Sequence, residues 1–307
     1  MRQSPDGEFV HESARPVDLA ATIGPLRHGS RDPCHQLAAD GSIWRTSAMP
    51  SGPVTYRLSQ LSTHEVRCQA WGSGSGELLA GLSELLGDSD DNSSFEPDHP
   101  KLVDAHRRHR GLRIPRTGRV LESLVPAVLE QKVTGKEAFH SWYVLVTRYG
   151  PAAPGPAPSA MRVPLTAEQW RLVPSWDFHR AGVDPQRSRT IVSCARVSVQ
   201  LERCSELSPQ DAQRRLMSVP GVGEWTAAEV GQRALGDADA LSVGDYHLSG
   251  IIGWTMLGRP IDDAEMVEYL EPLRPHRHRA VRLLQISGQA FKPRFGPRIT
   301  IQDHRRH

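Results

Sequence analysis

The sequence is poor in cysteine, lysine and long apolar runs, and each shortage excludes a class of protein. Its four cysteines are widely scattered and include no CxxC pair, which excludes a disulfide scaffold, an ordinary zinc ribbon and a closely spaced iron–sulfur ligand set. No run approaches the roughly 18 apolar residues of a membrane-spanning helix, and residues 1–15 lack the apolar core of a secretory signal. We therefore expect a soluble protein of the reduced cytosol.

Lysine is so scarce that the positive charge is carried almost entirely by arginine: only four of the 37 Lys and Arg residues are lysines. The formal net charge of +2 is close to neutral and indicates no partner by itself. Its distribution is uneven, because residues 72–100 carry seven carboxylates without a Lys or Arg, whereas residues 101–120 carry seven Lys or Arg and residues 272–307 carry nine. Basic segments of this kind are typical of surfaces that meet a polyanion, and arginine suits phosphate contacts.

Two hydrophobic periods divide the chain. Alternation with period two at residues 54–58 and 66–70 predicts half-buried antiparallel strands, and the leucines of residues 77–86 predict a short helix. From about residue 118 the period becomes helical, and further helices are expected near 134–149, near 186–204, after an N-cap at Ser208-Pro209, and at 224–235, 245–256, 262–270 and 276–289.

These periods predict an α+β protein. The expected parts are a disordered tail at 1–15, a small mixed α/β domain with an antiparallel sheet at 16–115, an all-helical domain at 116–295 and a basic tail at 296–307.

The most informative segment runs from Leu216 to Ala228 and reads LMSVPGVGEWTAA. A helix is expected to end before its Pro-Gly-Val-Gly turn and a second helix to begin after it. The glycines permit a tight turn and leave the backbone N–H groups uncovered. Because such groups at a helix N-terminus bind phosphate, the segment predicts a grip on a nucleic-acid backbone; the alternative is a plain αα-hairpin with a glycine turn.

About twenty residues further on, Asp245 follows an apolar stretch and begins a predicted helix. One interpretation is a helix N-cap, worth roughly 1 kcal/mol. The other is a carboxylate at the mouth of a cleft, where it stabilises a sugar cation or orients a water molecule. The two roles are compatible.

Together, the hairpin and Asp245 resemble the helix-hairpin-helix DNA glycosylase superfamily, and within it the 3-methyladenine DNA glycosylase II (AlkA-type) branch. Residues 121–138 are similar to the helix with which this family presents a glutamine and a neighbouring wedge residue to DNA. The α/β segment before it matches the position of the family's N-terminal domain. The likeness covers about residues 16–295, and the pairing of hairpin and aspartate is its most specific part.

The resemblance implies roles for particular residues. It places Asp245 at the catalytic position and Lys132 at the wedge that fills the gap left by an extruded base. The base-pocket positions fall on Trp225, Gln131, Glu229 and Ser287. The other DNA-binding positions fall on Gly221, Val222, Gly223, Thr226 and His247. The main-chain carbonyls of Met217, Val219 and Val222 fall where such hairpins hold a monovalent cation.

Several positions depart from the family pattern. Glu229 and Ser287 fall where aromatic pocket walls are usual, and Lys132 falls where the wedge is usually apolar. Glu229 is therefore expected either to recognise a cationic base by charge or to be a solvated helix residue. Trp225 stands where bifunctional members carry the lysine that forms a Schiff base, so a monofunctional enzyme is expected.

The function that the resemblance implies is a monofunctional DNA glycosylase, which flips and excises alkylated purines of the 3-methyladenine or 7-methylguanine type in base excision repair. It is expected to need no cofactor and no iron–sulfur cluster, to bind damaged double-stranded DNA as a monomer without a membrane, and to work in the cytoplasm at the nucleoid. Two alternatives stay open: a glycosylase for another lesion, such as a deaminated base or a bulky adduct, and a non-catalytic DNA-structure binder with a degenerate pocket.

Overall fold

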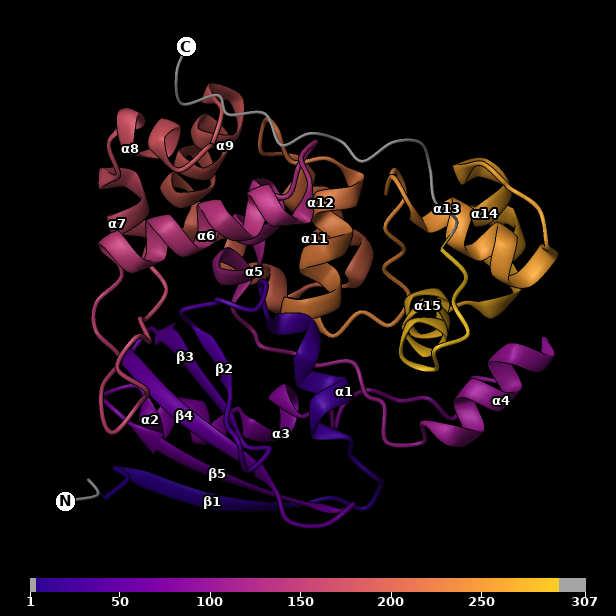
Figure 1. Cartoon of the computed structure of the whole chain (residues 1–307), viewed down its shortest axis with the longest axis horizontal. Coiled ribbons are helices and arrows are strands. Elements are labelled where there is room, and N and C mark those ends of the chain that lie inside the picture. Colours follow the sequence, from indigo (N-terminus) through magenta and orange to yellow (C-terminus); the bar gives the residue numbers. More distant parts are fainter. Residues whose placement is uncertain (1–3, 293–307) are drawn as a thin grey trace.

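An antiparallel sheet forms the N-terminal layer of the molecule (Figure 1). The computed structural model describes residues 4–292. The strands are β1 (Gly7–Glu12), β2 (His35–Leu37), β3 (Ile43–Met49), β4 (Gly52–Gln60) and β5 (Glu65–Trp71). Their order is β1-β5-β4-β3-β2, and every neighbouring pair is antiparallel. The strands predicted at 54–58 and 66–70 are confirmed by β4 and β5.

The prediction of a disordered tail at residues 1–15 is wrong for strand β1, which pairs with β5 from Gly7 opposite Ala70 to Glu12 opposite Glu65. Only His11 of this strand is buried, so its sequence carries no alternation of apolar residues from which a strand could be predicted. Backbone pairing with β5, rather than apolar burial, holds it in place. The basic tail expected at 296–307 lies outside the described residues.

Helices make up most of the remaining described chain. Those that come before residue 110 are α1 (Leu19–Ile23), α2 (Ser75–Ala80), α3 (Leu82–Leu85) and α4 (Pro100–Arg108). The later ones are α5 (Val120–Leu129), α6 (Gly135–Tyr149), α7 (Ala167–Leu172), α8 (Ser175–Arg180), α9 (Pro185–Arg196), α10 (Ser198–Glu202), α11 (Pro209–Met217), α12 (Glu224–Val230), α13 (Leu248–Ile252), α14 (Asp263–Leu270) and α15 (Arg277–Ile286). Short 3-10 or π-helical turns are η1 (Gly24–Leu26), η2 (Arg203–Glu206), η3 (Gly231–Leu235), η4 (Gly253–Leu257) and η5 (Glu271–Leu273). Across residues 4–292, no helix combines the length and apolar character that a membrane crossing requires.

Local signals explain several of these boundaries. Gly81 divides the helix predicted at 77–86 into α2 and α3. The predicted N-cap of α11 is confirmed, because the Ser208 side chain accepts a hydrogen bond from the amide of Asp211 and Pro209 occupies the first helical position.

Three apolar clusters hold the layers together. The first lies against the sheet, where residues of α1, α2 and α3 pack on Val54 and Leu58 of β4. The second surrounds α5, which is buried at every position except Glu122 and contacts α6, α9 and α12. The third joins α4, through Leu102 and Ala105, to α13, α14 and α15. Although α4 precedes residue 115 in the sequence, it packs against α15 and lies apart from the sheet (Figure 1).

Polar contacts tie these layers to one another at two points. The carboxylate of Glu122 on α5 accepts hydrogen bonds from Oγ of Ser47 at 2.8 Å and from the amide of Ala48 at 2.6 Å, both on β3. Asp90, which follows the sheet, forms an ion pair with Arg279 on α15, and both side chains are almost completely buried. Since a buried charge without its partner is costly, these pairs fix the position of α5 and α15 relative to the sheet.

Candidate functional site

The Pro-Gly-Val-Gly turn joins α11 to α12, as predicted. Gly221 has a φ of +92°, and a Cβ built on it would lie 2.1 Å from Oγ1 of Thr190 on α9. Both the backbone conformation and this neighbour exclude a side chain, so the position requires glycine. A Cβ on Gly223 would meet nothing within 4 Å, so the backbone there is open to an approaching group. Within residues 4–292 no acceptor receives the amide hydrogens of Gly223 and Glu224, which leaves both for a phosphate oxygen.

Gln131 fixes the loop between α5 and α6 against this hairpin. Its Nε2 donates to the carbonyl of Gly221 at 2.9 Å and to Oγ1 of Thr226 at 2.8 Å. The next residue, Lys132, is exposed and has a φ of 55°, a left-handed conformation that is uncommon outside glycine. One amide side chain thus holds the predicted wedge residue beside the predicted phosphate grip.

Two predictions need correction at this point. Gln131 was expected in the base pocket, but its amide is bound to the hairpin and it does not line the cavity described below. Thr226 was expected to bind DNA, but it is only 2% exposed and its hydroxyl accepts from Gln131. Both side chains therefore stabilise the hairpin through hydrogen bonds within the protein.

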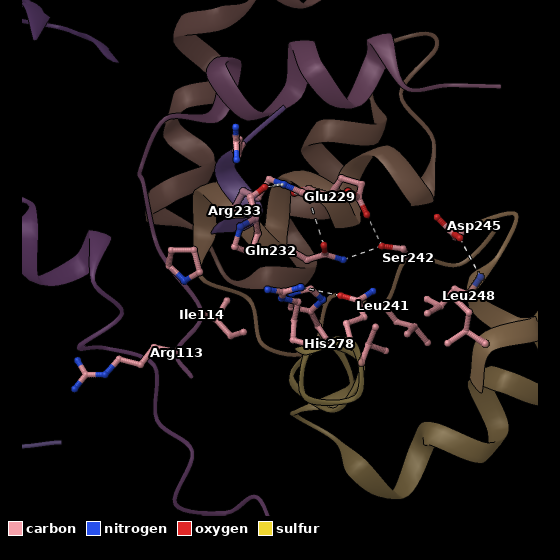
Figure 2. Close-up of a pocket in the computed structure, with 17 residues that line it drawn as sticks. Arg113, Ile114, Glu229, Gln232, Arg233, Leu241, Ser242, Asp245, Leu248 and His278 are labelled. Carbon is pink, nitrogen blue, oxygen red and sulfur yellow. Dashed lines mark hydrogen bonds and ion pairs between the residues drawn. The ribbon is translucent and has the colours of Figure 1, made fainter. Parts of the chain in front are cut away.

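Asp245 lies just before α13, and each of its carboxylate oxygens has a separate task. Oδ1 accepts hydrogen bonds from the amides of His247 at 2.8 Å and Leu248 at 3.0 Å, which confirms the cap interpretation. Oδ2 accepts from the indole Nε1 of Trp225 at 3.4 Å. The carboxylate remains half-buried and lies at the edge of a cavity, where Figure 2 shows it to one side of the group formed by Glu229, Gln232 and Ser242. The geometry therefore also permits the second interpretation.

Trp225 and Ser287, both expected in the base pocket, do not line this cavity. The indole of Trp225 is directed to Asp245, so it positions the carboxylate instead of forming a wall. Ser287 is the residue at which α15 ends, and its carbonyl accepts from the guanidinium of Arg108 at 3.5 Å.

His247 lies two residues after Asp245, and its ring packs edge-on against Tyr246 with the centroids 4.9 Å apart. Burial and the charge of Lys292 lower the pKa of the imidazole, while the charge of Asp245 opposes them. The ring is therefore neutral at pH 7, and its predicted contact with DNA would be a hydrogen bond, not an ion pair. That contact stays a prediction.

A cavity of about 340 Å³ opens beside Asp245 (Figure 2), within the usual size range of small-molecule sites. Its walls come from η1 and the following residue Arg27, from residues 113–115, from α12 with η3 and the loop that leads to Asp245, and from α13 and α15. Of the predicted site residues, only Asp245 and Glu229 line it.

Glu229 is neither solvated nor free to meet a cationic base. It is 9% exposed, and its Oε2 lies 2.7 Å from a terminal guanidinium nitrogen of Arg233. Its Oε1 accepts from Oγ of Ser242 at 2.6 Å, and that hydroxyl in turn accepts from Nε2 of Gln232 at 2.8 Å. Burial alone would lower the pKa of Arg233, but the charges of Glu229 and Glu130 outweigh it and leave the pKa raised. Arg233 is therefore protonated, and the carboxylate of Glu229 is engaged by Arg233 and Ser242 within the protein.

Two further cavity residues, His278 and Arg282, were missed by sequence reasoning. Burial, together with the charges of Arg282, Arg233 and Arg279, holds the pKa of His278 far below its usual value, so the imidazole is neutral. Burial and the charge of Arg233 lower the pKa of Arg282 to about 10, which still leaves it protonated at pH 7. The sequence did indicate that these two residues lie together. They are four residues apart on the helix predicted at 276–289, and residues at that spacing share one helix face.

Three main-chain carbonyls of the hairpin, those of Met217, Val219 and Val222, are the predicted cation ligands. The carbonyl of Val219 accepts from the amide of Val222 at 3.0 Å, while no donor in the described residues reaches the carbonyls of Met217 and Val222. Two unengaged carbonyls and one shared carbonyl on a tight turn fit a weakly bound monovalent cation. Elsewhere in residues 4–292, no group of three His, Cys, Asp or Glu side chains is arranged to hold a metal ion.

Comparison with known proteins gives consistent results. The chain matches no protein-family model. It is 30% identical over 279 residues to a probable bifunctional transcriptional activator/DNA repair enzyme AlkA of Mycobacterium tuberculosis, a match that covers 88% of this chain and 54% of that protein. The chain therefore spans about half the length of the curated relatives it matches.

Solved structures share the fold at lower sequence identity. A 3-methyladenine DNA-glycosylase from Archaeoglobus fulgidus has a TM-score of 0.78 at 17% identity and covers 91% of this chain and 98% of its own. An 8-oxoguanine glycosylase/lyase from Clostridium acetobutylicum has a TM-score of 0.72 at 12% identity and covers 93% of this chain and 98% of its own.

Proposed function

Since the chain belongs to the AlkA-type helix-hairpin-helix DNA glycosylase superfamily, we propose that it removes damaged bases from DNA. The observation that carries this proposal is the carboxylate of Asp245, which lies at the edge of a cavity and is bound through Trp225 to the helix that follows the glycine hairpin. A glycosylase needs these parts together: a grip on the strand, a space for the base and a carboxylate at the sugar.

The proposed mechanism follows from this arrangement. A base within a duplex is inaccessible, so the nucleotide is flipped out at a cost of about a few kcal/mol. The amides of Gly223 and Glu224 hold a backbone phosphate, and Lys132 occupies the space left in the base stack. As the glycosidic bond breaks, Asp245 stabilises the positive charge on the sugar and takes a proton from the attacking water. The water oxygen bonds to C1′, and the base leaves with the bonding electron pair.

Trp225 is proposed as the residue that positions Asp245. The variant Trp225→Phe keeps an aromatic ring but loses the N–H that Oδ2 accepts. We expect the single-turnover rate of base release to fall by about threefold to tenfold, the effect of one ordinary hydrogen bond, because the contact of 3.4 Å is long. DNA affinity, measured in parallel, is expected to be unchanged. A variant as fast as the wild type would show that the indole does not orient the carboxylate.

The proposed reaction is hydrolysis without a lyase step, because Trp225 stands two residues after Gly223, where bifunctional relatives carry their Schiff-base lysine. We expect that incubation with damaged DNA and borohydride yields no covalent protein–DNA adduct and no strand cleavage before alkali is added. Denaturing electrophoresis measures both. A trapped adduct that forms with the natural substrate would contradict the monofunctional proposal.

One structural neighbour is a 3-methyladenine DNA-glycosylase, and we take 3-methyladenine and 7-methylguanine as the first substrates to test. A second class, uncharged lesions such as deaminated bases, is favoured by one observation: among the described residues, the only carboxylate besides Asp245 that lines the cavity is Glu229, which is already paired with Arg233. Mass spectrometry of the bases freed from a mixture of damaged DNAs tests both classes. Tight binding to abasic DNA with no release from any lesion would instead support a non-catalytic DNA-structure binder.

We propose that the protein acts as a monomer on damaged duplex DNA at the nucleoid, and that the carbonyls of Met217, Val219 and Val222 hold a monovalent cation beside the bound phosphate. The cation would supply positive charge at the backbone and takes no part in bond breaking. Hydrolysis of a glycosidic bond needs neither a redox cofactor nor an iron–sulfur cluster.

A further inference from the structure

The described residues that line the cavity beside Asp245 carry more positive charge than their carboxylates balance: Glu229 is paired with Arg233, which leaves Asp245 alone against Arg27 and Arg282. In the described part of the chain, neither Arg27 nor Arg282 lies within ion-pair distance of an acidic side chain. Arg282 donates only to uncharged acceptors, and Nε of Arg27 is buried without an acceptor. Arg113 adds nothing to this surplus, because it pairs with Asp88 and Figure 2 shows its side chain turned away from the other labelled residues.

The acceptors of the cavity, by contrast, are already used. Both oxygens of Glu229 are engaged by Arg233 and Ser242, and the side-chain oxygens of Gln232 and Gln285 accept from Arg233 and Arg282. His278 is 8% exposed, and its ring forms no hydrogen bond to any residue in 4–292. A ligand in this cavity therefore meets N–H donors with free capacity and few free acceptors, so it must itself carry acceptor atoms.

We propose that this cavity selects uncharged bases that carry carbonyl oxygens, the class to which the deaminated purine hypoxanthine belongs, over cationic N-alkylated purines. The inference rests on the proposed function and specifies its substrate. A cationic base would bring a further positive charge beside Arg27 and Arg282, which Asp245 balances only in part, in a partly desolvated space where like charges repel strongly. A carbonyl oxygen would accept from the same guanidinium groups.

The same cations also suit the chemistry that an uncharged base requires. When the C1′–N bond of such a base breaks, the electron pair stays on the base and leaves it negatively charged, whereas a cationic alkylpurine leaves as a neutral molecule. Arg282 and Arg27 would stabilise that departing anion, while Asp245 stabilises the sugar cation. The water oxygen bonds to C1′, one of its protons passes to Asp245, and that proton then neutralises the released base.

The first test uses the wild-type protein and two duplexes that differ only in one nucleotide, hypoxanthine or 7-methylguanine. The single-turnover rate of release from each is divided by the spontaneous rate of loss of the same base at the same pH. We expect this enhancement to be at least about tenfold larger for hypoxanthine, because the interactions proposed act on its transition state. An equal or larger enhancement for 7-methylguanine would overturn the inference.

The second test removes one charge. In Arg282→Met the rate with hypoxanthine is expected to fall by about 100-fold, while the rate with 7-methylguanine changes by less than about threefold or rises. Arg282→Lys, which keeps a cation, is expected to recover part of the loss. The matched control is Arg67→Met on β5, whose arginine pairs with Glu8 on the sheet and whose rates are expected to equal those of the wild type. Equal losses on both substrates in Arg282→Met, with a native circular dichroism spectrum, would overturn the inference.

Failure of the inference and failure of the proposed function give different results. If the wild type releases 7-methylguanine in a manner that depends on Asp245 but does not release hypoxanthine, the glycosylase proposal stands and the substrate inference is wrong. If neither base nor any other lesion is released, the proposed function itself is wrong and the inference falls with it.

Discussion

Asp245→Asn is expected to abolish base release and to leave a folded protein that still binds DNA. The side-chain oxygen of asparagine can accept from the amides of His247 and Leu248 as the carboxylate does, and asparagine caps helices as well as aspartate. We therefore expect the free energy of unfolding to change by less than about 0.5 kcal/mol. Only the negative charge is lost, and with it the stabilisation of the sugar cation, so release is expected to fall by about 1000-fold or more.

The measurement is single-turnover release from duplexes with hypoxanthine and with 7-methylguanine, beside the affinity for a duplex that contains an abasic site. Asp263→Asn is the matched control, because Asp263 accepts from the amide of Gly244 in the same loop but does not line the cavity. Asp245→Ala separates the two roles: it should lose release to the same extent and also about 1 kcal/mol of stability, because the cap is gone. Wild-type rates in Asp245→Asn would show that the carboxylate serves the helix alone.

The fold could be predicted where buried residues recur at regular spacing in the sequence. Strands β4 and β5 were found because their apolar residues alternate toward a core, and α5 because its apolar residues recur at helical spacing. Strand β1 was missed because it is placed by backbone pairing with β5 and buries one polar side chain, and β2 because three residues are too short for a pattern. The packing of α4 against α15 could not be predicted either, because the apolar face of a helix does not indicate which element it packs against.

The site could be predicted where its parts are adjacent in sequence. The hairpin and Asp245 were identified because the glycines and the carboxylate each serve a local backbone structure as well as the proposed chemistry. The cavity could not be predicted from the sequence. Arg27 and residues 113–115 form part of its wall, and they lie far before the residues of α12, α13 and α15 that form the rest.

Glu229 shows a third case, in which the signal was present but was given too little weight. Sequence reasoning offered either a contact to a cationic base or a solvated carboxylate. Arg233 lies four residues later on the same helical face, a spacing at which opposite charges pair, and the structure pairs them at 2.7 Å. Because Glu229 is paired, its charge is not available to a cationic base, and the cavity has more free donors than free acceptors. The substrate inference depends on this pair.

Gly221→Ala is expected to lower both stability and DNA affinity. The alanine Cβ would lie 2.1 Å from Oγ1 and 3.1 Å from Cγ2 of Thr190, which is buried on α9, and the backbone would have to keep a φ of +92°. We expect the free energy of unfolding to fall by about 2–4 kcal/mol, from left-handed strain and overpacking together. Because the hairpin would move to relieve the clash, affinity for abasic duplex is expected to fall by at least about tenfold. Chemical denaturation and a binding titration measure the two effects.

Gly223→Ala is the matched control for the steric part, because a Cβ there meets nothing within 4 Å, and its stability is expected to stay within about 1 kcal/mol of the wild type. The two causes at Gly221 can then be separated by adding Thr190→Ala, which removes the nearest atoms but not the backbone strain. The double variant is expected to regain about half of the lost stability, a coupling of the size seen between residues in contact. A double variant no more stable than Gly221→Ala would refute the steric argument, and it would leave the left-handed backbone as the reason that this hairpin requires glycine.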